Sequence, residues 1–115
     1  MVSKLILINA QSNLKSPYII GKKGDVILCD TRPVPEGGIG EPLRVLLPDA
    51  KTNAGRVVTI KDAGAHAHRR SITIERQIPD VLDGGNTALT ITEPSGYKTF
   101  ISDGERTWFL IGTVE

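Results

Sequence analysis

The chain has 115 residues, the length of one ordinary domain, and its 39% hydrophobic and 23% charged residues are typical of a globular protein. Fourteen Lys and Arg oppose thirteen Asp and Glu, which leaves a formal net charge of +1. A charge so near zero argues against nucleic acid and against a polybasic membrane surface as partners. The single cysteine, Cys29, excludes an internal disulfide and a cysteine-rich zinc site.

The N-terminal segment Met1–Ile8 ends in a short apolar run, Leu5–Ile8. This run is shorter than the roughly 7–15 apolar residues of a signal peptide, and Asn9 and Gln11 follow it in place of a small-residue cleavage site. No apolar run approaches the roughly 20 residues of a membrane helix. We therefore predict a first β-strand here, synthesis in the cytoplasm, and a reduced, buried Cys29.

Glycine and proline are spread along nearly the whole chain and leave little room for helices, which average about 11–12 residues. Between these turn residues, short runs rich in Ile, Val and Thr recur and predict strands. With turn signals every 8–12 residues or so, seven to nine short strands predict an all-β fold, a small antiparallel β-sandwich or barrel-like domain. After the first strand, the clearest candidates are Asp25–Asp30, Leu43–Leu47, Arg56–Lys61, Ser71–Glu75, Thr87–Thr92, Tyr97–Ser102 and Thr107–Ile111.

Two segments do not fit a regular series of strands. Residues 31–42 (TRPVPEGGIGEP) carry three prolines and three glycines and predict a long exposed loop. Residues 77–86 (QIPDVLDGGN) predict a second irregular crossing. We expect one domain over 1–115, and we name Pro33 and Pro35 in the first loop, with Leu5 and Leu7 in the first strand, as candidate contacts with other subunits or another partner.

The sequence offers no convincing set of catalytic residues. Cys29 lies inside an apolar strand, where burial raises the pKa of a thiol and makes it less reactive. No serine lies in a Gly-x-Ser-x-Gly motif, and the aspartates sit mainly in turns, where they hydrogen-bond their own backbone. The glycines at 37–40 lack the Gly-Lys-Ser/Thr of a phosphate-binding loop. We expect a protein that is not an enzyme and has no cofactor.

His66 and His68 are the weak candidates for a metal site. On an extended strand, residues two apart lie on one face, where both imidazoles would reach one ion, and three such pairs would surround an ion in a threefold assembly. The alternative is that residues 65–70 form the turn between two strands. Arg69 and Arg70 would repel a cation there.

Trp108 and Phe109 are adjacent in a predicted strand, so their side chains point to opposite sides of a sheet. One is expected to fill the core and the other to face solvent or a partner. We name Trp108 as a candidate contact residue. A glycan-binding role would use this pair or Tyr97, through packing of an aromatic ring on a sugar.

The second half of the chain resembles a β-rich module of tailed-bacteriophage virion proteins, found in fibre and spike segments and in small capsid-decorating proteins. The similarity covers residues 46–112. It rests on the order and spacing of several segments: Leu47–Ala50 (LPDA), Gly55–Asp62 (GRVVTIKD), Ser71–Ile74 (SITI), Asp83-Gly84, Leu89–Ile91 (LTI), Tyr97–Gly104 (YKTFISDG) and Trp108–Gly112 (WFLIG). Residues 1–45 do not share it, and the two histidines with Arg69 and Arg70 replace the small polar turn residues usual in the module.

The resemblance implies a non-enzymatic virion component, usually a homotrimer on the outside of the particle, without a cofactor. A capsid decoration (cement) protein that stabilises a phage head by binding its major capsid protein is the leading expectation. A tail, neck or fibre component and a glycan-binding module for host recognition are the alternatives.

Overall fold

The computed structural model of the protein describes residues 5–8, 18–22, 24–32, 43–85 and 87–114, and of residues 5–8 it describes the backbone. The fold is nearly all β, as predicted. The helical part of the described residues is one short 3-10 helix, η2 (Ala50–Thr52). No helix among the described residues is long and apolar enough to cross a membrane.

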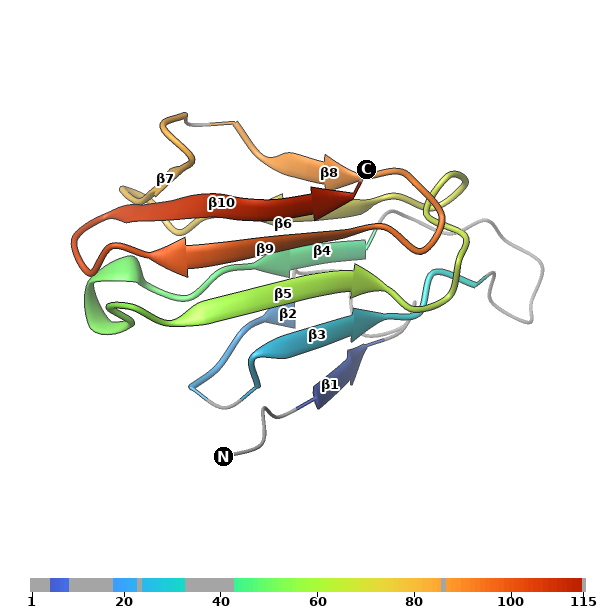
Figure 1. Ribbon diagram of the computed structural model, residues 1–115, viewed down its shortest axis with the longest axis horizontal. Helices are drawn as coiled ribbons and strands as arrows, with labels where there is room; N and C mark the ends of the chain where they lie inside the picture. The colour runs from blue at the N-terminus through green and yellow to red at the C-terminus, as the bar shows by residue number, and fades with distance from the viewer. Residues whose placement is uncertain (1–4, 9–17, 23, 33–42, 86, 115) are drawn as a thin grey trace.

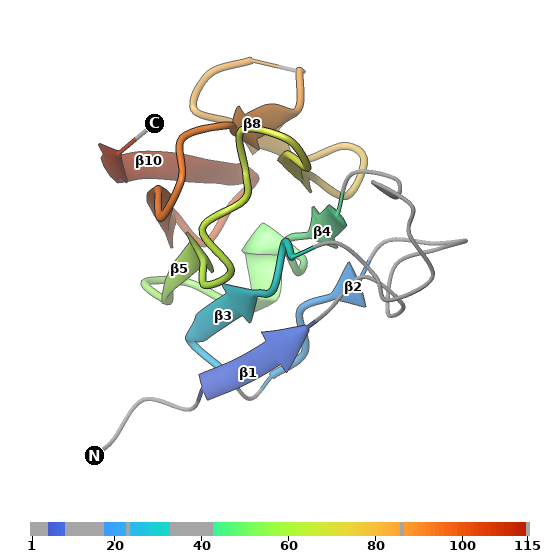
Figure 2. The same ribbon diagram turned by 90° about the vertical axis from the view of Figure 1, so that its right-hand side faces the viewer.

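The strands form two sheets stacked one behind the other, with the strands along the long axis of the molecule (Figure 1). The six-stranded sheet has the order β1 (Leu5–Ile8), β3 (Val26–Cys29), β5 (Val57–Asp62), β9 (Tyr97–Ser102), β10 (Thr107–Val114) and β7 (Val81–Leu82). The four-stranded sheet has the order β2 (Tyr18–Ile19), β4 (Leu43–Leu46), β6 (Ile72–Glu75) and β8 (Leu89–Ile91). Figure 2 looks along the strands, with β1, β3, β5 and β10 in one layer and β2 and β4 in the other.

The prediction of an antiparallel domain is wrong, because many neighbouring strands run parallel. β1, β3 and β5 are parallel to one another, as are β2, β4 and β6, and β10 is parallel to β7. The chain alternates between the sheets from β1 to β8, and each strand from β3 to β7 enters its sheet from the same end as the strand before it in that sheet, whereas β8 enters from the opposite end. Only the pairs β5–β9, β9–β10 and β6–β8 are antiparallel among the described strands.

The core lies between the two sheets and takes alternate residues from strands of both, since successive side chains in a strand point to opposite faces. Trp108 and Phe100 are its largest members, and both are fully buried. The indole Nε1–H of Trp108 donates a hydrogen bond of 2.9 Å to the carbonyl oxygen of Pro48, which satisfies the one polar atom of this side chain. Cys29 is buried in the same core, as expected.

Every strand that the sequence analysis located is present, within a few residues of its expected limits. The two-residue strands β2 and β7 were not expected, and β7 lies in the segment predicted as an irregular crossing. Strands from residues 1–45 and from the remainder pair within the same sheets, as β3 does with β5 and β4 with β6. The part of the chain that carries the resemblance and the part that does not therefore share one core.

Candidate interaction surface

The outward side of the six-stranded sheet is almost free of charge. Strand pairing places its side chains in rows that cross the sheet. One row joins Val57, Ile101 and Phe109, and a second joins Val26, Thr59 and Thr99. A third row joins Leu28, Lys61, Tyr97 and Val114. We call the uncharged members of these rows the apolar face: Val26, Leu28, Val57, Thr59, Tyr97, Thr99, Ile101, Phe109 and Val114.

Several side chains of the apolar face are well exposed in the single chain. The exposed fractions are 41% for Val57, 44% for Phe109 and 47% for Val114. The two threonines in the middle of the face satisfy each other, since Thr59 Oγ1 and Thr99 Oγ1 are 2.9 Å apart and hydrogen-bonded across β5 and β9. The polar atoms of this face are thus largely used within the sheet, and what it presents outward is mainly aliphatic and aromatic surface.

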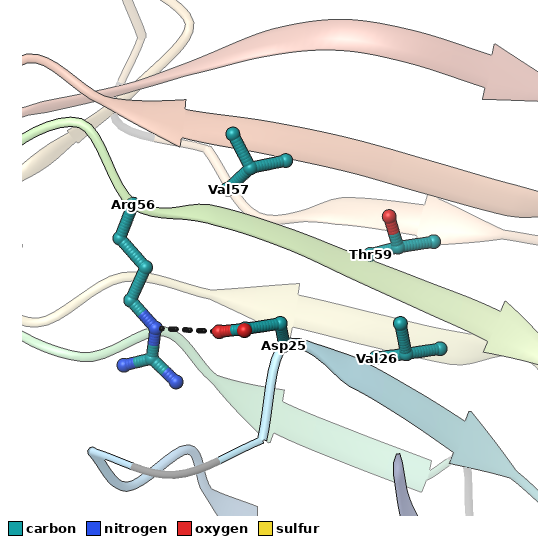
Figure 3. A pocket seen from close by; sticks show the side chains of 5 residues that line it. All are labelled: Asp25, Val26, Arg56, Val57 and Thr59. Atoms are coloured by element: carbon teal, nitrogen blue, oxygen red, sulfur yellow. Dashed lines mark hydrogen bonds and ion pairs between the residues drawn. The ribbon is translucent and has the colours of Figure 1, made fainter. Parts of the chain in front are cut away.

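A shallow depression of about 320 Å³ marks the margin of the apolar face between β3 and β5. Figure 3 shows Val26, Val57 and Thr59 on its walls, with Arg56 reaching across to Asp25. Arg56 Nε donates to Asp25 Oδ1 at 3.2 Å, and Arg56 Nη2 donates to the carbonyl oxygen of Gly24 at 2.7 Å. These two charges neutralise each other, so the depression continues the neutral character of the face.

The strand directions give a physical reason to expect that the apolar face is covered. Parallel sheets in folded proteins are covered on both faces, and their strands have apolar residues on both sides. The parallel strands β3 and β5 follow this pattern, because Val26 and Leu28 point outward while Ile27 and Cys29 are buried. In this chain the inner side of the sheet packs on the four-stranded sheet, and no described residue covers the outer side.

The outer side of the four-stranded sheet has a different chemistry. Arg44 and Glu75 form a two-pronged ion pair there, with Arg44 Nε to Glu75 Oε2 at 2.6 Å and Nη2 to Oε1 at 3.1 Å. Thr73 and Thr90 lie on the same side. Ile19 and Leu46 share the row of Glu75 on this side, so the face is mixed, with charged, polar and apolar side chains.

The predicted contact residues fall in three different situations. Leu5 and Leu7 lie in β1, whose backbone register places them opposite Val26 and Leu28 of the apolar face. Pro33 and Pro35 lie outside the described residues. Trp108 is fully buried and offers no surface, so the choice of Trp108 as a contact is wrong.

Phe109, the neighbour of Trp108 in sequence, is the aromatic side chain that faces outward. The sequence analysis predicted that the two would face opposite ways but assigned the contact to the wrong member. It also missed Val57 and Ile101, although a signal was present: β5 and β9 each contain adjacent large apolar residues, Val57-Val58 and Phe100-Ile101. Such a pair places apolar side chains on both faces of a sheet.

His66 and His68 lie in the turn between β5 and β6, which is the alternative that the sequence left open. Their rings stack with centroids 6.1 Å apart and planes 21° from parallel. His66 Nδ1 is 2.7 Å from the carbonyl oxygen of Gly64, so this nitrogen carries the proton and donates it. The described residues contain no group of three or more His, Cys, Asp or Glu side chains able to hold a metal ion.

The most elaborate polar cluster surrounds the buried carboxylate of Asp62, at the end of β5. Its oxygens accept hydrogen bonds from the Thr31 hydroxyl at 2.5 Å and from the backbone N–H groups of residues 64, 65, 67 and 95, at 3.0–3.1 Å. Thr31 Oγ1 in turn accepts the N–H of His66 at 2.9 Å. Asp62 thus fixes three loops at one end of the sheets, and its lone pairs are engaged in that task.

The thiol of Cys29 is not activated by its surroundings. Burial raises the pKa of Cys29 far above its usual value, and the nearby charge of Asp62 raises it further. A thiol in this state remains protonated and is a poor nucleophile.

No family model matches the chain, and no curated protein has a significant match to it.

Proposed function

We propose that this protein is a non-enzymatic structural component of a tailed-phage particle, a capsid decoration protein that binds the outer surface of the head as a homotrimer. The observation that carries the proposal is the apolar face. A surface built on partly parallel strands whose one charged side chain, Lys61, donates to the carbonyl oxygen of Ser95 at 2.6 Å is suited to burial against a copy of itself, because association desolvates little charge. The resemblance over residues 46–112 supplies the setting, a virion.

The two outer faces suggest a division of tasks. The apolar face would meet neighbouring copies of the chain, and burial of Val57, Ile101 and Phe109 would stabilise the trimer. The charged outer side of the four-stranded sheet, with Arg44 and Glu75, would remain outside this contact. It is then available for polar recognition of the major capsid protein, with steering by charge. The domain would stabilise the capsid by binding to it, and this role requires no catalytic residue.

Sedimentation of purified protein tests the self-association. We expect the wild type to sediment at three times the 12.4 kDa mass of the chain at micromolar concentration. Phe109→Lys places a charge in the apolar face and is expected to give folded monomers, which melt below the wild type because they lack the stabilisation that association supplies. Thr90→Lys, an exposed strand position on the other sheet, is the matched control and should remain trimeric. A monomeric wild type would overturn the trimer.

Electron cryo-microscopy of particles assembled with and without the protein tests the location. Extra density on the outer surface of the head supports decoration, and density at the tail or neck supports the alternative assignment. A glycan-binding role would have to use Tyr97 or Phe109, since Trp108 is buried. Saturable binding to a glycan array that is lost in Tyr97→Ala, with no density on any particle, would overturn the structural role.

A further inference from the structure

The six-stranded sheet has two open edges as well as an open face, and these edges lie at its opposite ends. β1 pairs with β3 on one side, and no described strand pairs with its other side. At the far end β10 is eight residues long, but β7 pairs with only Thr107 and Trp108. In Figure 2, β1 and β10 mark the two ends of this layer.

The covered part of the β10 edge ends at a definite residue. The Asp83 N–H donates to the carbonyl oxygen of Trp108 at 2.8 Å, and the carboxylate of Asp83 accepts the N–H of Leu110 at 3.2 Å. Beyond Leu110 no described residue hydrogen-bonds to this edge. The uncovered stretch is therefore Ile111–Val114, where Ile111 is 56% exposed and Val114 is 47% exposed.

An open strand edge of this kind is unusual in a protein that stays monomeric. Edge strands are normally protected by charged residues, by proline or by being very short. In the four-stranded sheet the edge strands are short, two residues in β2 and three in β8. Ile111–Val114 (IGTV) extends an eight-residue strand and carries no charge and no proline. The register of β10 against β9 shifts between Leu110 and Gly112, so a bulge at the start of this stretch is its one irregularity, and the residues after it are again regularly paired with β9.

We infer that in the assembly the open edge of β10, from Ile111 to Val114, is covered by strand β1 of a neighbouring copy. This inference rests on the proposed self-association and names the segments that meet. The lengths match, four residues of β1 against four uncovered residues of β10. Both segments are uncharged, and Leu5–Ile8 is an unbroken aliphatic run.

The strand directions agree with this pairing. β1, β3, β5, β7 and β10 all run the same way, and β9 alone runs opposite to them in this sheet. If copies are related by rotation about an axis along the strands, the neighbour's β1 runs parallel to β10. It would then continue the parallel ladder that β7 begins at Thr107 and Trp108. Such a contact joins two different edges, and it closes into a ring when the rotation closes.

The same arrangement also covers the apolar face. Three sheets that meet edge to edge around one axis can each turn the apolar face toward that axis. With strands about 4.8 Å apart and three rows of side chains, the face spans roughly 400 Å² on β3, β5, β9 and β10. That is about half of the roughly 800 Å² per partner in a standard interface. Edge pairing supplies additional contact, and it satisfies backbone groups that a face-only contact leaves open.

Disulfide trapping tests the pairing, in a Cys29→Ala background that removes the buried thiol. Leu7 and Val114 belong to the same row of the sheet, so Leu7→Cys in one protein and Val114→Cys in another should cross-link when mixed under mild oxidation. A chain with both substitutions should give covalent species of two and three chains. Leu5→Cys, two residues away on the same face, tests a shifted register. Ile19→Cys, exposed on β2, is the control that should not cross-link with Leu7→Cys.

The outcomes separate this inference from the proposed function. Cross-linking of Val114→Cys with itself as the main product would show that β10 meets β10, and it would overturn the inference. A trimer by sedimentation without any β1–β10 cross-link, in either register, would overturn the inference and leave the proposed homotrimer standing. Monomers by sedimentation in the wild type would overturn the proposed association and the inference together.

Discussion

The outer faces of the two sheets differ in a way that their common core does not require. Each sheet supplies alternate residues to one core, and either outer face would be stable against water if its side chains were polar. The four-stranded sheet is partly built that way, with the Arg44–Glu75 ion pair across β4 and β6 beside the apolar Ile19 and Leu46. The six-stranded sheet instead places Val57, Ile101 and Phe109 in one outward row. Folding explains the inner side chains, and the outer row needs a second explanation, which the proposed association would supply.

The sharpest form of this contrast is found within β10, and it gives the largest predicted effect. Trp108→Ala removes a fully buried indole and its hydrogen bond to Pro48, and it should lower the free energy of unfolding by about 3–5 kcal/mol. Phe109→Ala, one residue further, should cost about 1 kcal/mol or less, because its ring is on the outer face. Denaturant titration of dilute, monomeric protein measures both.

The effects of the two substitutions on association should have the opposite order to their effects on stability. Phe109→Ala is expected to weaken the trimer, whereas Trp108→Ala at temperatures where it is folded should leave the contact largely intact. Equal effects of both substitutions on stability, with neither changing the sedimentation of the protein, would show that the outer row has no role beyond the single chain.

Sequence reasoning located the strands well, because a short Ile-, Val- and Thr-rich run between turn residues is a local signal. It failed on strand direction, because direction depends on the sheet that each segment joins. Val26–Cys29 and Val57–Asp62 look the same whether their neighbours are parallel or antiparallel. Only the alternation of successive strands between two layers makes β3 and β5 parallel. The two-residue strands β2 and β7 are too short to show any periodicity.

The sequence predicted that a contact surface exists, but most of the residues that form the apolar face were not predicted. The sequence indicated a contact near Trp108 and Phe109, yet which of the two points inward depends on the register of β10 against β9, where Trp108 is opposite Ser102. The cluster around Asp62 was not predicted either. Thr31 lies 31 residues before Asp62 in the sequence and Ser95 lies 33 residues after it, and only the folded loops bring the three together.

Substitutions on the outer side of the four-stranded sheet can remove the difference between the two outer faces. Replacing both Arg44 and Glu75 by leucine removes an ion pair that is partly exposed and therefore contributes little to stability. The stability of the chain should change by a similar small amount. The outer side of the four-stranded sheet would become apolar, and we expect new self-association through it. Light scattering and sedimentation measure this change.

A background with Phe109→Lys separates the new contact from the original one. There the double leucine variant should still associate, because its contact uses the other sheet. The single variant Arg44→Leu, which leaves Glu75 with an unpaired charge, is the matched control and should associate less. If the double variant stays monomeric in the Phe109→Lys background, an apolar face alone is insufficient, and the open edge of β10 becomes the decisive element.

The smallest predicted effect concerns the turn that joins β9 to β10 and so aligns the two strands that carry Tyr97, Ile101 and Phe109. Asp103 Oδ1 accepts the backbone N–H groups of Glu105, Arg106 and Thr107 at 2.8, 3.0 and 3.0 Å. These bonds, with that from Thr107 the largest contribution, hold the pKa of Asp103 below its usual value. A carboxylate with a lowered folded-state pKa stabilises the folded chain above its unfolded pKa, near 3.9, and this contribution is lost as the pH falls through the folded value.

Asp103→Asn keeps an oxygen that accepts these hydrogen bonds but removes the charge that strengthens them. At pH 7 the variant should melt at a slightly lower temperature than the wild type, and the gap should close as the pH falls from about 4 through the lowered pKa of Asp103. Asp30, whose pKa is also lowered, mainly by its hydrogen bonds from Arg32, titrates in both proteins and cancels in the difference. A gap that stays constant from pH 7 to pH 2 would mean that the turn depends on geometry alone, and that the charge of Asp103 does not help to align the outer row.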